Sequence, residues 1–134
     1  MEPVTDDHWC FACGRENPHG LRLQGFRPQG EWLVVDFTPG REHQGWREVT
    51  HGGLVATVLD EVMTWLLYRQ GLDAVTAELA VRYHHPLPTG HPVQARARET
   101  LRRGRLVRAE AQLVEGGGRV LASAEGKFLL VQEG

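Results

Sequence analysis

Two adjacent glycines and a downstream aspartate form the pattern in this sequence that is most suited to chemistry. Gly52 and Gly53 follow His51 at the start of a strongly apolar segment, and Asp60 lies seven residues after Gly53. Each glycine disfavours a helix by about 1 kcal/mol relative to alanine, so we expect a functional reason for the pair. Glycines at a helix N-terminus leave backbone N–H groups accessible at the positive end of the helix dipole. Such groups suit a carbonyl oxygen that becomes negatively charged during a reaction.

The aspartate supplies the second half of this prediction. Seven residues make about two helical turns, so Asp60 is expected on the same side of the helix as Gly53. A carboxylate near a polarised carbonyl can activate water as a general base, or can attack the carbonyl carbon as a nucleophile. Thr64, one turn further along, is placed to orient the water.

The alternative is that the polar residues of this segment simply face water. They recur at helical spacing in one narrow seam, which consists of Thr57, Asp60, Glu61, Thr64 and Tyr68. Glu61 is rotated by about 100° from Asp60 around a helix, so we expect it to be a surface or interface acid.

The segment that carries this seam is predicted to be one long helix, from Gly52 or Gly53 to Arg69. Gly71, just beyond this end, is suited to a left-handed helix cap. One face carries an apolar stripe that we expect in the core, formed by Leu54, Val55, Val58, Leu59, Val62 and Leu66.

Alternating apolar and polar residues predict strands on both sides of the helix. The predicted strands cover residues 21–26, 31–38, 75–83, 93–101, 107–113 and 120–131, and Leu101 shares the apolar face of its strand. A single helix can cover only one face of such a sheet, with the sheet curled around it. We therefore predict an α+β fold with one long central helix wrapped by a curved antiparallel sheet. The other face of the sheet and its edge strands then need cover, which favours a homodimer or homotetramer.

Length and composition indicate one domain over residues 1–134, with an irregular arm over residues 1–20. The 41% hydrophobic content is typical of a globular protein. No apolar run approaches the roughly 20 residues of a membrane span, and the N-terminus lacks the features of a signal peptide. We expect a soluble, cytoplasmic protein with no membrane partner. The net charge of −2 gives no general attraction for nucleic acid.

The two cysteines, Cys10 and Cys13, form a single C-x-x-C motif. His8 and His19 flank the pair and could complete a zinc site by residue type. Without a second C-x-x-C, the motif favours two packed or partly exposed thiols, and we predict no metal.

A group of arginines lies on the strands after the helix, with Glu99 as the single acid among them. Close together, they would form an anion site suited to phosphate; otherwise they line a solvated strand face. The six are Arg96, Arg98, Arg102, Arg103, Arg105 and Arg108.

The stretch HGGLVATVLDE resembles the hotdog-fold acyl-CoA thioesterases, especially those similar to the phenylacetate-pathway and 4-hydroxybenzoyl-CoA thioesterases. The family motif is His-Gly-Gly followed, nine residues after the histidine, by Asp or Glu; here these are His51 and Asp60. The stretches EHQGWREVTHGG and CFACGRENPHGL look like signatures of one subgroup. The resemblance implies a hotdog fold and an acyl-CoA substrate, with no cofactor other than the coenzyme A of that substrate.

The resemblance also implies residue roles. Asp60 would be the catalytic carboxylate, and the N–H of Gly53, together with Gly52, would polarise the thioester carbonyl. Thr64 matches a position where some members place a hydroxyl. Gln44 is a candidate for holding the carbonyl or the water, although its spacing to the histidine differs by one residue from better-known members.

The resemblance implies further roles for residues in comparable positions. His51 is either a structural residue at the helix start or an acid–base group. Asn17 is expected to reach the substrate pocket. The phosphates of coenzyme A would be met by three basic residues, Arg102, Arg103 and Arg105.

These residues predict hydrolysis of a small or medium acyl-CoA thioester to a free acid and coenzyme A. The alternative is a non-catalytic acyl-CoA-binding or regulatory domain. Asp60 favours the enzyme, because a pure binder gains nothing from a buried acid beside a carbonyl. A hydratase is a weaker third reading, since its usual Asp and His motif is missing from the sequence.

Overall fold

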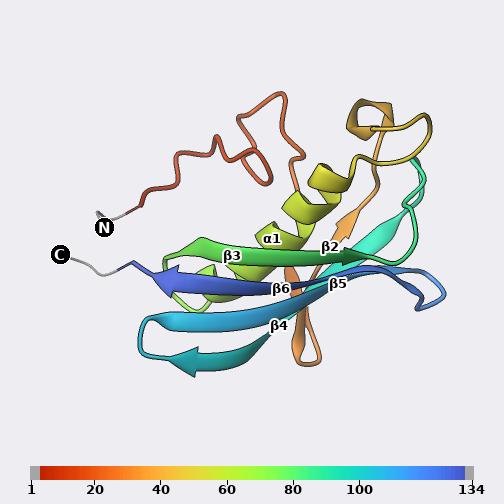
Figure 1. Ribbon diagram of the computed structural model, residues 1–134. Coiled ribbons are helices and arrows are strands. Elements are labelled where there is room, and N and C mark those ends of the chain that lie inside the picture. The colour runs from red at the N-terminus through yellow and green to blue at the C-terminus, as the bar shows by residue number, and fades with distance from the viewer. Residues whose placement is uncertain (1–3, 132–134) are drawn as a thin grey trace.

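The computed structural model describes residues 4–131, which form a six-stranded antiparallel sheet curled around one long helix. The order of the strands across the sheet is β1-β2-β4-β5-β6-β3, and Figure 1 labels β2 to β6. Along the chain the helices and strands are β1 (Arg27–Gln29), β2 (Trp32–Phe37), η1 (Arg41–His43, a 3-10 turn), α1 (Gly52–Tyr68), β3 (Ala74–Tyr83), β4 (Val93–Arg103), β5 (Leu106–Glu115) and β6 (Val120–Leu130). The predicted α+β architecture is confirmed.

The helix begins and ends where local sequence signals place it. His51 is the N-cap, and its side chain accepts a hydrogen bond from the N–H of Gly53. At the other end Gly71 has a φ of 79°, in the left-handed region that glycine tolerates best. The next N–H, of Leu72, donates 3.1 Å to the carbonyl of Leu67 and closes the last turn. The predicted start and the predicted cap are confirmed, while the helix ends at Tyr68, one residue before the predicted end, with Arg69 as its C-cap.

The core lies between α1 and the concave face of the sheet. The helix presents fully buried side chains, namely Val58, Leu59, Val62, Met63 and Leu67. Small residues in the middle of the sheet let the helix approach closely. A Cβ added at Gly126 would lie 3.1 Å from Cε of Met63 and 2.6 Å from the ring of Phe128. A larger residue there would push the helix outward.

The predicted strand over residues 21–26 is wrong. Arg22 and Gly25 have φ values of 54° and 81°, which bend the chain out of an extended conformation. The N–H groups of Leu21 and Leu23 pair instead with the carbonyls of Phe11 and Ala12, inside the N-terminal arm. The first strand, β1, therefore begins only at residue 27.

The prediction for Leu101 is also wrong, because this side chain is 40% exposed. The register of β4 against β5 shifts between Glu99 and Leu101. Such a bulge moves the following side chains to the opposite face of the sheet. A second shift, between Thr76 and Glu78, interrupts the pairing of β3 with β6.

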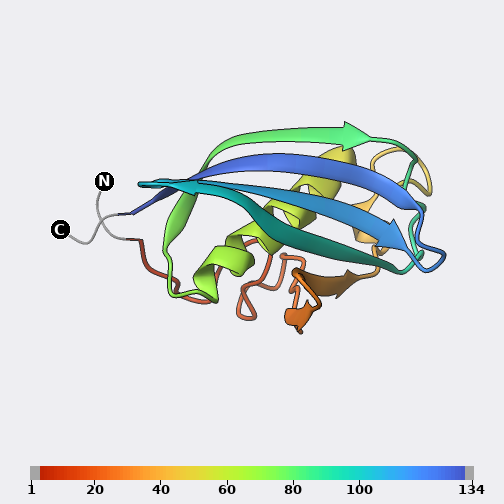
Figure 2. The same cartoon turned by 90° about the horizontal axis from the view of Figure 1, so that it is seen from below.

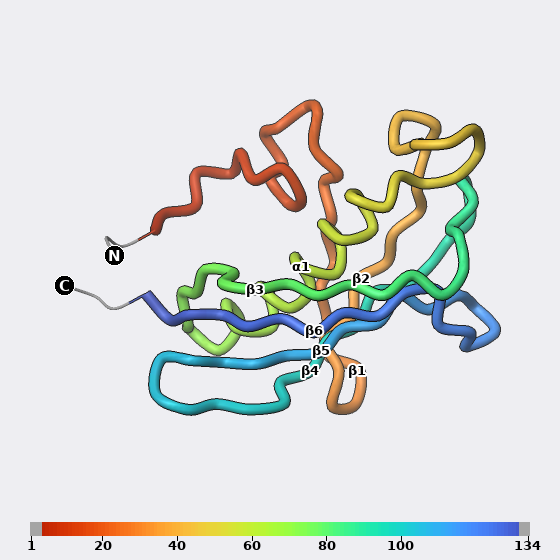
Figure 3. Tube along the Cα trace, in the orientation of Figure 1, coloured from red at the N-terminus to blue at the C-terminus, as the bar shows by residue number. Residues whose placement is uncertain are grey.

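The N-terminal arm, residues 4–26, contains no helix or strand and packs on α1 from the side away from the sheet. Figure 2 shows the helix between the sheet and this arm, and Figure 3 follows the arm as the red and orange trace. Ala12 and Leu23 are only 3% and 4% exposed and join the core. No helix in the described part of the chain is long and apolar enough to cross a membrane.

Candidate active site

Asp60 lies in the middle of α1, half-buried, beside the edge strand β3. Its Oδ1 accepts a 2.8 Å hydrogen bond from the hydroxyl of Thr76. Burial raises the pKa of Asp60 above its ordinary value of 3.8, and the hydrogen bond from Thr76 lowers it. A carboxylate with a raised pKa and one fixed donor is suited to taking a proton from water.

Thr76 was missed by the sequence analysis, which assigned the nearby hydroxyl to Thr64. The Oγ1 of Thr64 instead donates 3.0 Å to the backbone carbonyl of Asp60, one turn back along the helix. Thr76 is sixteen residues from Asp60 and reaches it only because β3 folds back alongside α1. No local spacing in the sequence signals that contact.

The start of α1 has a defined hydrogen-bond arrangement. The N–H of Gly53 donates 2.9 Å to Nδ1 of His51, so this imidazole bonds the backbone. The carbonyl of Gly52 accepts 2.6 Å from the hydroxyl of Tyr83. Within residues 4–131, the N–H of Gly52 has no hydrogen-bond partner. Of the two predicted carbonyl-binding N–H groups, that of Gly52 is accessible and that of Gly53 is shared with His51.

Gln44 and Asn17 are engaged in their own loops. Oε1 of Gln44 accepts 3.0 Å from the N–H of Glu48 and steadies the loop before α1. Oδ1 of Asn17 accepts 3.0 Å from the N–H of His19 inside the arm. Neither side chain contacts Asp60 in the described residues, so the structure does not bring them to the carboxylate.

Five of the six arginines fall into two groups, and Arg108, exposed on β5, belongs to neither. Arg96 and Arg98 lie over the ring of Trp32, with guanidinium carbons 4.5 and 4.3 Å from its centroid. Arg98 also pairs with Glu31 and Glu110, acids that come from neighbouring strands. The sequence showed only Glu99 near these arginines, because cross-strand partners are remote in the chain. Arg96 and Arg98 are therefore part of a sheet surface on which nearby acids neutralise the positive charge.

The second group lies at the tip of the β4–β5 hairpin, where Arg102, Arg103 and Arg105 gather. Arg102 donates to Gln70 at 2.7 Å and Arg105 donates to the carbonyl of Leu130 at 3.1 Å. Gln70 follows the last turn of α1, so the three arginines lie at the opposite end of the helix from the glycines. Seventeen helical residues separate these ends by about 25 Å.

The family model of the thioesterase superfamily matches residues 48–122, which include the helix, Asp60 and Thr76. The chain belongs to the thioesterase superfamily. The resemblance found in the sequence is thereby confirmed. A search of curated proteins returned no match.

Solved structures share the hotdog fold of this thioesterase superfamily member. Another member of the superfamily is 25% identical, over 96% of this chain and 72% of that chain, with a TM-score of 0.81. The PaaI protein of the E. coli phenylacetic acid degradation operon is 19% identical, with coverages of 84% and 81% and a TM-score of 0.77. A hypothetical thioesterase of Streptococcus pneumoniae, solved with coenzyme A, is 15% identical, with coverages of 83% and 88% and a TM-score of 0.75.

The pneumococcal protein has also been crystallised with an aspartate replaced by alanine and with a threonine replaced by alanine. Those two residues are sixteen positions apart in that chain, as Asp60 and Thr76 are in this one.

Glu61 was predicted to be a surface or interface acid, and the surface alternative is wrong. It is 9% exposed, because the N-terminal arm covers its side of α1. The Sγ atom of Cys10 lies 3.9 Å from both of its carboxylate oxygens. Burial raises the pKa of Glu61, and the charge of Asp60 adds to this, while hydrogen bonds from the cysteines and Trp65 lower it. His8 and His19, the predicted companions of the cysteines, are not in this cluster.

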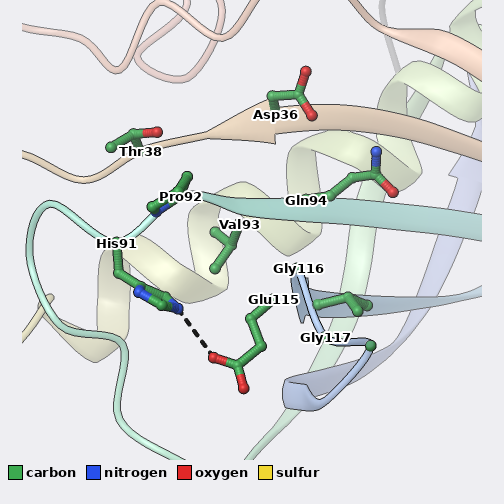
Figure 4. A pocket seen from close by; sticks show the side chains of 11 residues that line it. Asp36, Thr38, His91, Pro92, Val93, Gln94, Glu115, Gly116 and Gly117 are labelled. Atoms are coloured by element: carbon green, nitrogen blue, oxygen red, sulfur yellow. Dashed lines mark hydrogen bonds and ion pairs between the residues drawn. The ribbon is translucent and has the colours of Figure 1, made fainter.

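Among the pockets of residues 4–131 are two of particular interest, and neither is lined by Asp60 or Thr76. Figure 4 shows one of about 760 Å³ near the ends of β2, β4 and β5, where Nε2 of His91 is 3.0 Å from Oε2 of Glu115. It contains none of the predicted site residues. A second, of about 280 Å³, lies along α1 and is lined by Glu61, Thr64 and both cysteines. Asp60 lines neither pocket.

Proposed function

We propose that this chain hydrolyses small or medium acyl-CoA thioesters to a free acid and coenzyme A. The observation that carries the proposal is the half-buried Asp60, fixed by Thr76, on the helix that begins with His51-Gly52-Gly53. Membership of the thioesterase superfamily supports it. The matching separation of the aspartate and threonine altered in the pneumococcal protein supports the pairing of Asp60 with Thr76.

In this mechanism the thioester oxygen accepts hydrogen bonds at the start of α1, from the N–H of Gly52 and from that of Gly53 when His51 shares it. Asp60 takes a proton from water as the water oxygen bonds to the carbonyl carbon. The carbon–sulfur bond then breaks, and the sulfur leaves as the thiol of coenzyme A with the proton held by Asp60. If Asp60 acts as a nucleophile instead, its carboxylate oxygen bonds to the carbonyl carbon, the carbon–sulfur bond breaks, and coenzyme A leaves as the thiolate. Water then hydrolyses the resulting acyl-aspartate anhydride to the free acid and the Asp60 carboxylate, and a proton from that water neutralises the thiolate. Neither route needs a further cofactor.

One substrate cannot use both groups of a single chain, which replaces the expectation that Asp60 acts on a carbonyl held by the glycines of its own helix. Gly53 and Asp60 are about 10 Å apart along the helix axis, and the N–H groups at a helix start point away from the helix. An attacking oxygen must lie within about 3.5 Å of the carbonyl carbon. We therefore propose a homo-oligomer in which the glycines of one copy and Asp60 of another serve the same thioester.

Coenzyme A is long enough to extend from such a shared site toward basic residues elsewhere on the dimer. The three arginines at the β4–β5 hairpin, Arg102, Arg103 and Arg105, are proposed to meet its phosphates. Their position at the far end of α1 from Gly52 is compatible with an extended ligand.

Hydrolysis should be tested with a panel of acyl-CoA thioesters. Because Cys10 and Cys13 are free thiols, the reaction is best followed by loss of the thioester absorbance, without a thiol reagent. Asp60→Asn should lower turnover by about 100-fold or more while keeping the fold and substrate binding. Asp36→Asn, an exposed acid paired with Arg27, is the matched control. Nearly full activity in Asp60→Asn would refute the role of Asp60, and binding without turnover in the wild type would favour a non-catalytic domain.

Sharing of the site between copies has its own test. Asp60→Asn and Gly53→Val are each expected to be inactive as homo-oligomers. Co-expressed, they form mixed dimers in which one site receives the intact glycine of one copy and the intact Asp60 of the other. Activity should therefore reappear in the mixture. A mixture as inactive as its parents would place both groups in the same chain.

A further inference from the structure

The N-terminal arm and α1 together enclose a cluster that the proposed hydrolysis does not use. The Sγ atoms of Cys10 and Cys13 and a carboxylate oxygen of Glu61 all lie within 4.8 Å of one another. Ligand atoms around a tetrahedral zinc ion are about 3.5–3.8 Å apart, given Zn–S and Zn–O distances of about 2.3 and 2.1 Å. Small side-chain rotations would bring these three atoms to that spacing.

Burial raises the pKa of Cys13 and of Glu61, so protons must leave the cluster when it binds a cation. Each of its three groups becomes negative when it loses a proton, and Asp60 adds a further acid on the same helix. Within residues 4–131, Glu61 forms no ion pair with any lysine, arginine or histidine. A buried carboxylate without a positive partner is costly, and a bound metal ion would supply that partner.

The cysteines are held on a compact turn. The N–H of Gly14 donates 2.8 Å to the carbonyl of Cys10, directly after the second cysteine. A Cβ at Gly14 would lie 2.4 Å from the nitrogen of Cys10 and 2.6 Å from the carbonyl oxygen of His8, so only glycine fits. Ala12, between the cysteines, is buried against the core. The thiols are therefore positioned by a close-packed loop, and the carboxylate by a helix.

The cluster is open on one side. The pocket of about 280 Å³ along α1 is lined by all three groups and also by Thr64, Trp65 and other residues. It gives an ion a route of entry and leaves room for water as a fourth ligand. A zinc site with three protein ligands and one water is a known arrangement.

We propose that Cys10, Cys13 and Glu61 bind a thiophilic divalent metal ion, Zn²⁺ being the best match to two thiolates and one carboxylate. The ion ties the N-terminal arm to the residue next to Asp60. The proposal corrects the view from the sequence, in which a single C-x-x-C lacked further ligands, because the third ligand comes from fifty-one residues away. It does not depend on the proposed hydrolase activity.

The test uses the full chain, reduced and treated with a chelator, then titrated with Zn²⁺ by calorimetry and with Co²⁺ by absorption spectroscopy. We expect one ion per chain, thiolate-to-cobalt charge-transfer bands, and a higher melting temperature with Zn²⁺. Cys10→Ser and Cys13→Ser should lose the bands, and Glu61→Gln should weaken Zn²⁺ binding by about tenfold or more. Glu16→Gln, an exposed acid of the same arm, should bind as the wild type does.

Melting curves of the metal-free variants show whether each one folds, so a loss of binding can be separated from a loss of structure. Three results would overturn the proposal. They are no saturable Zn²⁺ binding by the reduced wild type, cobalt spectra without thiolate bands, and undiminished Zn²⁺ affinity in Glu61→Gln.

Discussion

The hydroxyl of Thr76 donates a 2.8 Å hydrogen bond to Oδ1 of Asp60, and so links the edge strand β3 to the middle of α1. The carboxylate keeps its second oxygen for water, while its first is fixed by this bond. Because burial and the hydrogen bond move the pKa of Asp60 in opposite directions, Thr76 affects this pKa as well as the orientation of the carboxylate.

Thr76→Val should therefore change the pH dependence of hydrolysis. The variant lacks the donor that lowers the pKa of Asp60, so this pKa should rise further above 3.8. Since the base must be ionised, the acidic limb of the kcat/KM profile should move to higher pH. The profile should be measured with a chelator present, so that metal ions near Glu61 do not contribute.

Two variants make that test specific. Thr76→Ser keeps the hydroxyl and should keep the wild-type limb, whereas Thr100→Val removes an exposed hydroxyl on β4 and should also leave it in place. If Thr76→Val retains the wild-type limb, the hydrogen bond to Asp60 does not act on the base.

His51 is expected to stabilise the start of α1 as its N-cap. Its Nδ1 accepts from the N–H of Gly53, so His51→Ala should lose this cap and destabilise the fold by about 1 kcal/mol. His51→Asn supplies another acceptor and should recover most of that stability. Chemical denaturation measures the change, and turnover should fall less in the Asn variant than in the Ala variant. Equal loss of turnover in both, with stability restored only by Asn, would instead indicate acid–base work by the imidazole.

The prediction for Gly126 concerns the packing of α1 on the sheet. An added Cβ would lie 2.6 Å from the ring of Phe128 and 3.1 Å from Cε of Met63, and both side chains are fully buried. Gly126→Ala should lower the free energy of unfolding by about 1–3 kcal/mol. Gly117→Ala is the matched control, because its Cβ would meet nothing within 4 Å. Similar denaturation midpoints for the two variants would argue against a tight helix–sheet contact.

The helix and most strands could be predicted because their signals are local. His51, the glycines and Gly71 mark the helix ends, and alternation marks β2 to β6. The segment 21–26 misled because its apolar residues alternate like a strand. Its backbone bends at Arg22, and its N–H groups pair inside the arm. The alternation of apolar and polar residues indicates neither feature.

The site could be predicted only where it lies within one element. Asp60 was found from its spacing to the glycines on the same helix. Thr76 and the burial of Glu61 depend on β3 and the N-terminal arm packing against that helix from distant parts of the chain. Helical periodicity places a side chain on a face, but it does not reveal what covers that face.

The arginines at the β4–β5 hairpin give a prediction that separates phosphate recognition from chemistry. Replacing Arg102, Arg103 and Arg105 together with alanine should raise KM for an acyl-CoA by about tenfold or more, with little change in kcat. The same acyl group on N-acetylcysteamine, which lacks the nucleotide phosphates, should be hydrolysed as by the wild type. Raising the ionic strength should likewise raise the KM of the wild type for the acyl-CoA.

Arg119→Ala is the control for that triple variant, because Arg119 lies in the turn before β6 and pairs with Glu115. It should leave both reactions unchanged. An equal loss on the two thioesters in the triple variant would mean that the hairpin supports the fold or the oligomer. It would then not bind phosphate. Calorimetric titration with coenzyme A alone gives an independent measure, since the phosphates are present and no bond is broken.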